Sequence, residues 1–312
     1  EWGVSQYRDQ FSQTKLSGLS AYFQTMNESI SPLVAVDWLA SRFDRTGIRT
    51  LDATFFLPHQ GRNAGMEFHR EHIPGSRFFE LDKIADQQST LPHMLPSAEQ
   101  FADSAGKLGI DKDTHVVVYD NNSFMASARV WWTFRVFGHE QVSVLDGGFK
   151  LWKSLGFPVE HRLSPVIARQ FEADYRQSLV RNIDEILQTL KTSDTQIVDA
   201  RSYGRFAGAE PEPRPGLRSG HIPNSINLPF TEIIDPENGC LKPGNELCGL
   251  FKSLGVSLEK SLVASCGSGV TASILVLALY CIGKKDAAVY DGSWTEWGAR
   301  TDTPIATCGD SC

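Results

Sequence analysis

The chain repeats one pattern twice, and this duplication limits its possible folds more than any other feature. The sequence His-Ile-Pro-Gly-Ser at residues 72–76 recurs as His-Ile-Pro-Asn-Ser at residues 221–225, which is 149 residues later. Two further pairs keep the same order at nearly the same spacing: Leu-Asp-Ala at 51–53 with Val-Asp-Ala at 198–200, and Leu-Asp-Gly-Gly at 145–148 with Tyr-Asp-Gly-Ser at 290–293. Such ordered self-similarity indicates a duplicated unit. The 312 residues leave room for two domains of ordinary size.

Alternating strand-like and helix-like segments predict the fold of each unit. Short runs rich in β-branched residues lie at 114–119, 141–145, 196–198 and 261–264, and helix-length amphipathic stretches lie at 126–137 and 183–190. This alternation is typical of an α/β fold, so we expect each unit to be a parallel β-sheet covered by helices on both faces. The expected organisation is an N-terminal extension (1–30), a first domain (31–160), a linker that packs along the surface (161–179), a second domain (180–306) and a tail (307–312).

Charge, hydropathy and cysteine usage exclude several classes of protein. The formal net charge of −7 argues against binding nucleic acid or an anionic membrane through the overall field of the chain. The longest apolar run, 274–282, has nine residues, about half the length of a membrane span, and predicts a buried helix. The six cysteines are too sparse for a disulfide-stapled secreted domain and lack zinc-site spacing. We therefore expect a reducing compartment and no bound metal.

The first 30 residues bear on the location of the protein. They are rich in Ser, Gln and Thr and contain no compact apolar stretch, which argues against a secretory signal. Their acidic residues, Glu1, Asp9 and Glu28, are unlike an organelle-targeting peptide. We expect a cytoplasmic or mitochondrial protein.

The two units differ at the loop that follows their equivalent central strands. Val-Val-Val-Tyr-Asp at 116–120 aligns with Leu-Val-Ala-Ser-Cys at 262–266, so Asp120 stands where the second unit has Cys266. Ligands of α/β sheets bind at this end of the strands, where loop amides and a helix N-terminus converge. A cysteine before a buried helix is by itself more often a small core residue. The glycines after Cys266 favour a nucleophile instead, because a curled loop directs amides that stabilise a thiolate.

Together these motifs resemble the tandem rhodanese-type sulfurtransferases over about residues 31–306. The resemblance rests on the loop at 266–271, the paired His-Ile-Pro motifs, Ala-Arg-Val-Trp-Trp at 128–132 with Phe-Gly-His at 137–139, Glu-Pro-Glu-Pro-Arg at 210–214, and Tyr-Asp-Gly-Ser-Trp at 290–294. It implies two domains of one fold, of which only the second is catalytic. It also implies a persulfide intermediate on Cys266 and no metal or organic cofactor.

The residues after Cys266 distinguish between the reactions of related proteins. Relatives that use thiosulfate typically carry Arg and Lys directly after the cysteine, where this chain has Gly267 and Ser268. Related phosphatases need an arginine six positions after it, where this chain has Ala272. The resemblance therefore implies 3-mercaptopyruvate as the small-molecule sulfur donor, with thiosulfate:cyanide sulfur transfer as the alternative. A non-catalytic rhodanese-fold binding module is a third reading, against which the intact Cys266 loop argues.

The donor is expected to bind through arginines and the loop of the second unit. Its carboxylate and keto group call for fixed cations, and Arg205 and Arg214 match substrate-binding positions of the family. The remaining residues expected to bind substrate are those of the loop: Gly267, Gly269, Val270 and Thr271. Without the resemblance, Arg205 reads as a surface residue and Arg214 as the ion-pair partner of Glu210 or Glu212.

The family pattern also implies a relay of Asp82, His93 and Ser268 that joins the two units. In such a relay the carboxylate orients the imidazole and the imidazole tunes the hydroxyl, which would protonate the departing enolate. Each of the three residues alternatively caps a helix or fixes a turn. The sulfur would pass from the Cys266 persulfide to a small thiol, cyanide or a thioredoxin-like protein.

Overall fold

Two parallel sheets of the same topology make up the structure, a computed structural model that describes residues 30–57, 60–192 and 194–308. The strand order is β1-β5-β4-β2-β3 in the first sheet and β6-β10-β9-β7-β8 in the second, and every strand pair within the sheets is parallel. This confirms the predicted duplication and the α/β fold. Residues 1–29 of the expected extension, and Cys312 in the tail, lie outside the described residues.

The elements follow one another in the same order in both domains. Those of the first domain are β1 (Leu33–Val34), α1 (Val36–Ala40), β2 (Ile48–Asp52), α2 (Ala64–Arg70), β3 (Arg77–Phe78), α3 (Leu81–Ile84), α4 (Ala98–Lys107), β4 (His115–Tyr119), α5 (Ser127–Val136), β5 (Val142–Leu145) and α6 (Gly148–Ser154). Those of the second are η2 (Gln177–Leu179), β6 (Val180–Arg181), α7 (Ile183–Thr189), β7 (Thr195–Asp199), α8 (Tyr203–Ala207), β8 (Ile226–Asn227), η3 (Phe230–Ile233), α9 (Gly244–Ser253), β9 (Ser261–Ser265), α10 (Ala272–Cys281), β10 (Ala288–Tyr290) and α11 (Ser293–Trp297).

The central strands lie where the β-branched runs predict them. β4 and β9 each form the middle strand of a sheet, and their last four residues are all buried. A strand covered by helices on both faces buries successive side chains on opposite sides, so its sequence is a continuous apolar run rather than an alternating one. Both strands therefore end at the interior of the molecule, and the loops that follow them are held there.

The repeated histidines have the same structural role in both domains. The His72 ring stacks on Phe68 and its Nδ1 hydrogen-bonds the Phe68 carbonyl at 2.7 Å. The His221 ring stacks on Phe206 and bonds its carbonyl at 2.8 Å. Each ring fixes the end of the helix before it, so the conservation of the motif between the two copies reflects folding of the unit.

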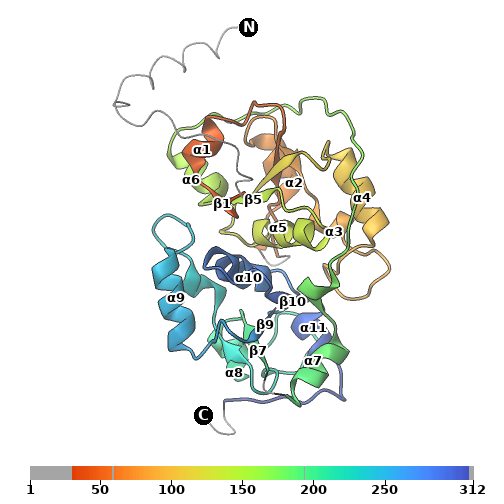
Figure 1. Ribbon diagram of the computed structural model, residues 1–312, viewed down its shortest axis with the longest axis vertical. Coiled ribbons are helices and arrows are strands. Elements are labelled where there is room, and N and C mark those ends of the chain that lie inside the picture. Colours follow the sequence, from red (N-terminus) through yellow and green to blue (C-terminus); the bar gives the residue numbers. More distant parts are fainter. Residues whose placement is uncertain (1–29, 58–59, 193, 309–312) are drawn as a thin grey trace.

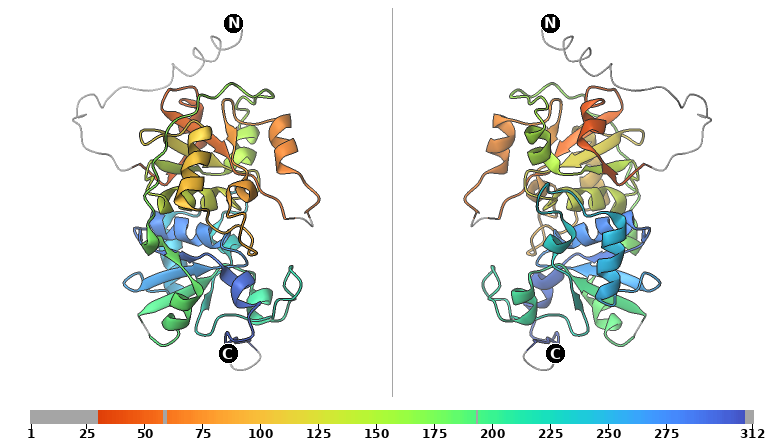
Figure 2. Two further views of the ribbon diagram at one scale, coloured as in Figure 1. Left: turned by 90° about the vertical axis from the view of Figure 1, so that its right-hand side faces the viewer. Right: turned by 90° about the vertical axis from the view of Figure 1, so that its left-hand side faces the viewer.

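Two helices join the domains face to face. Figure 1 shows α5 of the first domain directly above α10 of the second, and both views of Figure 2 show the domains stacked along this junction. All ten residues of α5 are buried, and so are the first eight of α10. Trp131 packs edge-on against Tyr280 across the junction. The predicted buried helix at 274–282 is thus α10, whose apolar surface is covered by its own sheet and by the other domain.

The segment between the domains packs against the first domain. Phe171 is buried among Phe101, Phe134 and His139, and the amides of Asp174 and Arg176 bond carbonyls at the end of α5. Figure 1 shows this segment running down one side of the molecule to α7. None of the helices in the described ranges is long and apolar enough to span a membrane.

Candidate active site

Cys266 follows β9 directly and is the first residue of the loop that leads to α10. Its side chain is 1% exposed. The Cys266 amide donates to Ser293 Oγ at 3.2 Å, and its carbonyl accepts from the Trp294 amide at 3.0 Å. The thiol is therefore held by the start of α11 as well as by its own strand. In the described residues Cys266 and the other four cysteines, Cys240, Cys248, Cys281 and Cys308, are all free thiols.

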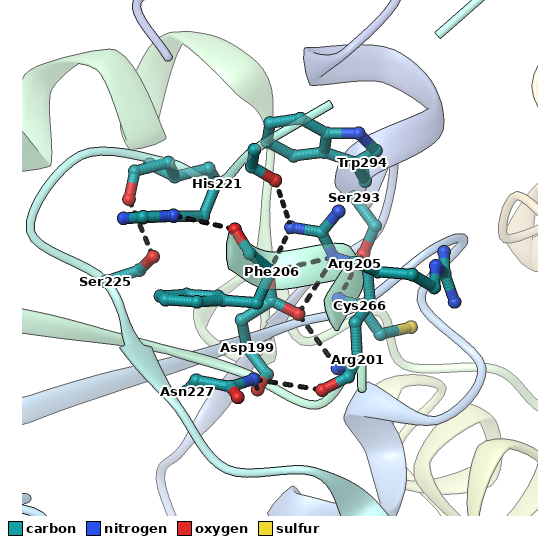
Figure 3. Close-up of polar contacts among 12 residues, drawn as sticks. Asp199, Arg201, Arg205, Phe206, His221, Ser225, Asn227, Cys266, Ser293 and Trp294 are labelled. Atoms are coloured by element: carbon teal, nitrogen blue, oxygen red, sulfur yellow. Dashed lines mark hydrogen bonds and ion pairs between the residues drawn. The ribbon is translucent and has the colours of Figure 1, made fainter. Parts of the chain in front are cut away.

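Arg205 lies directly over the Cys266 loop. A Cβ placed on Gly267 would come within 3.1 Å of Arg205 Nη2. The guanidinium is held by Glu212, whose Oε2 accepts from Nη2 at 2.6 Å, and the Glu212 side chain is 2% exposed. Figure 3 shows the Arg205 side chain and the Cys266 sulfur extending to the same side of the loop. Arg205 is thus a partly buried cation beside the Cys266 loop.

A second arginine, Arg201, helps to hold the Glu212 carboxylate that pairs with Arg205. Arg201 is fully buried, pairs with Asp199 through Nε and Nη2, and donates from Nη1 to Glu212 Oε1 at 2.8 Å. Its guanidinium also lies 4.2 Å from the centre of the Trp294 ring. Glu212 therefore bridges two arginines, and the chain Asp199–Arg201–Glu212 fixes the Arg205 guanidinium. Figure 3 shows the Asp199–Arg201 part of this chain.

Arg214 reaches the site from the Pro-rich loop and contacts the first domain. Its Nη2 lies 3.4 Å from His93 Nε2. Burial lowers the pKa of Arg214, the Cys266 sulfur opposes this shift, and the nearby Arg205 guanidinium adds to it. Arg214 and Arg205 thus lie near each other and near the thiol, and the site combines residues from both domains.

The first two members of the predicted relay lie together. His93 Nδ1 is 2.5 Å from Asp82 Oδ1, which fits a ring that donates from Nδ1 and leaves the Nε2 lone pair to accept from Arg214. His93 is buried, has a positive φ of 62° and packs edge-on against Phe55. Among the described residues no hydrogen bond joins His93 to Ser268, and the group that meets Nε2 is Arg214. The link from His93 to Ser268 stays a prediction.

The loop residues expected to bind substrate follow Cys266 directly and are mostly buried. Ser268 and Val270 are 8% and 5% exposed, and Gly267 and Thr271 are partly exposed. Gly269 has a φ of +76°, and a Cβ there would lie 2.9 Å from both Arg129 Nη1 and the Asp291 carbonyl. Glycine is therefore required at this point of the loop. Across the described ranges no group of three or more His, Cys, Asp or Glu side chains is placed to hold a metal ion.

Sequence reasoning missed several residues that shape the site. Ser293 replaces the Gly148 of the first copy, keeps a positive φ of 48° and hydrogen-bonds the Cys266 amide, so the internal alignment contained a signal for it. Glu212 was considered only as a partner of Arg214, whereas it pairs with Arg201 and Arg205. The path of the Pro-rich loop decides which arginine pairs with Glu212, and this path could not be predicted from the sequence.

Comparison with known proteins identifies the family and the fold. The family described as "Rhodanese-like domain" matches residues 35–155 and 182–300. The 3-mercaptopyruvate sulfurtransferase of Rattus norvegicus is 46% identical over 274 residues, covering 86% of this chain and 92% of the relative. The thiosulfate/3-mercaptopyruvate sulfurtransferase 1, mitochondrial, of Arabidopsis thaliana is 42% identical over 313 residues, covering 93% of this chain and 82% of that one.

A solved structure supports the same assignment. The crystal structure of SseA from Escherichia coli, described with the rhodanese fold of 3-mercaptopyruvate sulfotransferases, superposes with a TM-score of 0.78. The two chains are 37% identical, and the match covers 85% of this chain and 99% of SseA. The chain therefore belongs to the rhodanese family, and it is a sulfurtransferase built from two rhodanese-like domains.

Proposed function

We propose that the protein moves the sulfur of 3-mercaptopyruvate to a thiol, cyanide or a thioredoxin-like protein, with release of pyruvate. The observation that carries this proposal is the charge distribution around Cys266. The residues next to the thiol, Gly267 and Ser268, are neutral, and the positive charge belongs to Arg205 and Arg214. This suits a donor whose carboxylate is separated from the transferred sulfur. The names of the rat and Arabidopsis relatives point to the same donor.

In the proposed first step, the Cys266 thiolate attacks the sulfur of the donor. A sulfur–sulfur bond forms, the carbon–sulfur bond breaks, and its electron pair leaves with the pyruvate enolate. The two arginines bind the carboxylate and the keto oxygen and stabilise the charge that develops on the enolate. A proton, which we assign to Ser268, completes pyruvate. The products are pyruvate and a Cys266 persulfide.

In the second step a nucleophilic acceptor attacks the outer sulfur of the persulfide. The sulfur–sulfur bond breaks, the acceptor keeps the outer sulfur and Cys266 returns as a thiolate. A thiol acceptor becomes a persulfide and cyanide becomes thiocyanate. The sulfur passes from the donor to the acceptor, and the redox state of the enzyme is the same before and after the cycle. The cycle therefore needs no metal or organic cofactor.

Two further proposals concern the alternative donor and the location. The name of the Arabidopsis relative includes thiosulfate, and two arginines also suit a sulfonate, so thiosulfate:cyanide sulfur transfer is the second candidate function. The neutral pair Gly267 and Ser268 favours 3-mercaptopyruvate over it. A cytoplasmic or mitochondrial location is proposed, the latter by analogy with the same relative.

The test is to incubate the protein with 3-mercaptopyruvate in the absence of an acceptor. We expect release of pyruvate and a gain in protein mass of one sulfur atom, and we expect neither with Cys266→Ser. Thiosulfate should load the protein less efficiently. A folded protein that gains no sulfur from either donor would be a non-catalytic binding module, and the proposal would be wrong.

A further inference from the structure

Arg129 of the first domain reaches across the domain junction to the Cys266 loop. It lies on α5, is 1% exposed and donates from Nη2 to Asp291 Oδ1 at 2.6 Å. The same Nη2 donates to the His93 carbonyl at 2.7 Å, and Nη1 lies 3.4 Å from the Gly269 carbonyl. One buried guanidinium thus contacts the His93 segment, the Cys266 loop and the carboxylate that follows β10.

Asp291 fastens the same segment from the second domain. Its Oδ2 accepts from the Leu95 amide at 2.9 Å, two residues beyond His93. The close fit of Gly269 against Arg129 and Asp291 leaves no space for a side chain there. Arg129 and Asp291 therefore form a buried ion pair with the His93 segment on one side and the Cys266 loop on the other.

Because the chain is duplicated, the contact of Asp291 with the first domain has an equivalent, in which Asp146 of the first domain contacts the second. In the part of the chain that the structure describes, this equivalent contact contains no arginine. Asp146, the equivalent of Asp291, accepts from the Leu241 amide at 2.9 Å, just as Asp291 accepts from Leu95. The position equivalent to Arg129 is Leu275, and within the described residues no cation pairs with Asp146. On that side the aspartate bonds an amide and the Cys240 thiol. Arg129 thus adds to Asp291 a contact that the equivalent aspartate lacks, and it does so on the side of Cys266.

We propose that Arg129, paired with Asp291, is a positioning residue that holds the His93 segment of the first domain against the Cys266 loop of the second. The inference rests on the proposed function, because positioning is meaningful only if Cys266 carries the chemistry. Without Arg129 the His93 carbonyl loses its donor, and the ring loses a fixed place between Asp82 and Arg214. Misplacement of a catalytic constellation by about 1 Å costs on the order of 100-fold in rate.

Arg135 provides a matched control on the same helix. It is also buried, donates from Nη2 to the Lys285 carbonyl of the second domain at 3.1 Å and lies over the Tyr280 ring. It therefore crosses the junction as Arg129 does, with no contact to the Cys266 loop or the His93 segment in the described residues. Arg135→Leu removes a buried interdomain arginine without touching the active site.

The experiment compares kcat and KM for 3-mercaptopyruvate in Arg129→Leu, Arg129→Lys and Arg135→Leu. Because Arg129→Leu leaves Asp291 buried without a cation, Arg129→Leu combined with Asp291→Asn is also measured. In both Arg129→Leu variants we expect kcat to fall about 10- to 100-fold while KM changes little, since Arg205 and Arg214 remain. Arg129→Lys should lie between parent and Arg129→Leu, and Arg135→Leu should keep kcat.

A double-mutant cycle with His93→Ala shows whether Arg129 acts through His93. If it does, His93→Ala lowers kcat in the parent and in Arg135→Leu but adds little in Arg129→Leu. The proposal is overturned if Arg129→Leu loses no more kcat than Arg135→Leu. It is also overturned if the fold-loss of kcat in the double variant equals the product of the fold-losses in Arg129→Leu and His93→Ala. Failure of the proposed function is a different result, because the parent protein itself would then gain no sulfur from the donor.

Discussion

The loops after β4 and β9 occupy the same place in the two domains but differ in what their backbone amides bond. In the first domain, the carboxylate of Asp120 accepts hydrogen bonds from four amides of its own loop, those of Asn122, Phe124, Ala126 and Ser127, at 2.9 to 3.2 Å. In the second domain three of the four equivalent amides, those of Ser268, Val270 and Ala272, have no hydrogen-bond partner within the described residues, and the fourth, that of Ser273, bonds the Val270 carbonyl at 3.2 Å. One loop is closed by its own side chain and the other is open.

This difference explains how one fold serves as both scaffold and catalyst. The outer sulfur of a Cys266 persulfide is as many bonds from its Cα as the carboxylate oxygens of Asp120 are from theirs. The amides that hold the Asp120 carboxylate therefore indicate where the Cys266 loop stabilises a negatively charged outer sulfur. Under the proposed function, the cysteine loop holds the transferred sulfur, whereas the aspartate in the equivalent loop stabilises only the fold.

The charges beside the loops are also exchanged between the copies. Glu67 precedes the stacked Phe68 as Arg205 precedes Phe206, so a carboxylate in the first domain occupies the position of the arginine in the second. Glu67 pairs with Arg62, whereas Arg205 pairs with Glu212. The first domain thus lacks both the nucleophile and the cation next to it.

Substitutions at the two loop positions should have the largest and most different effects. Cys266→Ser should abolish sulfur transfer and leave stability nearly unchanged, because the change removes one nucleophile from a small-residue loop. Asp120→Ala should keep most of the activity but lower the free energy of unfolding by about 2–4 kcal/mol, because it leaves several buried amides unpaired. Steady-state turnover and denaturant unfolding of both variants check this. Equal loss of turnover in the two variants would contradict assignment of the chemistry to the second domain.

The next largest effect is expected at the two arginines. Arg205→Ala and Arg214→Ala should each lower kcat/KM for 3-mercaptopyruvate. The expected loss of transition-state stabilisation is about 1.5–3 kcal/mol, the value of a charge-assisted hydrogen bond. Arg62→Ala, which removes the arginine paired with Glu67 in the first domain, is the matched control and should leave kcat/KM unchanged. A change confined to the kinetics of the acceptor would speak against donor binding by Arg205 and Arg214.

Donor preference should change when the neutral residues after Cys266 become basic. The double variant Gly267→Arg with Ser268→Lys should gain thiosulfate activity and lose 3-mercaptopyruvate activity, because it adds charge beside the transferred sulfur and removes the Ser268 hydroxyl. The new arginine would meet Arg205, so it adds to an existing positive charge. The measurement is kcat/KM for both donors at one ionic strength, since salt screens charged substrates. An unchanged ratio in a folded variant would place donor specificity elsewhere, most simply at Arg205 and Arg214.

The last prediction concerns stability rather than activity, at the aspartates that end β2 and β7. Burial raises the pKa of Asp52 from 3.8 to about 6, whereas its counterpart Asp199 has the Arg201 guanidinium as partner. Folded Asp52 thus binds a proton more tightly than in the unfolded chain, and its contribution to stability is lost as pH rises through about 4 to 6. Asp52→Asn does not titrate, so its free energy of unfolding relative to the parent should rise by up to about 3 kcal/mol over that window.

The matched variant at the second domain should behave in the opposite way. Asp199→Asn removes one of the two carboxylates that pair with the buried Arg201, the other being Glu212, and should cost about 3–5 kcal/mol at neutral pH. Chemical unfolding of both variants from about pH 4 to pH 7 provides the comparison. A relative stability of Asp52→Asn that does not depend on pH would show that Asp52 is not desolvated as the structure describes.

The sequence was sufficient for features that depend on short stretches and their repetition. The βαβ alternation and the paired motifs predicted both sheets and the buried helix α10, and the mismatch of Asp120 with Cys266 distinguished the two loops. Local spacing did not predict contacts between distant segments, and the relay of Asp82, His93 and Ser268 was expected only through the family resemblance. Arg214 meets His93 rather than a nearby glutamate, and Arg129 meets Asp291, because the domain junction rather than local spacing brings these groups together. Residue type alone did not show which cation each buried carboxylate would reach.

The most direct test of the difference between the domains is to locate the transferred sulfur after one turnover. The parent protein is loaded with 3-mercaptopyruvate, its persulfides are trapped by alkylation, and peptides are mapped over all six cysteines. We predict one added sulfur on the peptide that contains Cys266, none on the peptides of Cys240, Cys248, Cys281, Cys308 or Cys312, and loss of the label when an acceptor thiol is added. Stable labelling of another cysteine in Cys266→Ser, together with continued release of pyruvate, would contradict the assignment of sulfur transfer to the open loop.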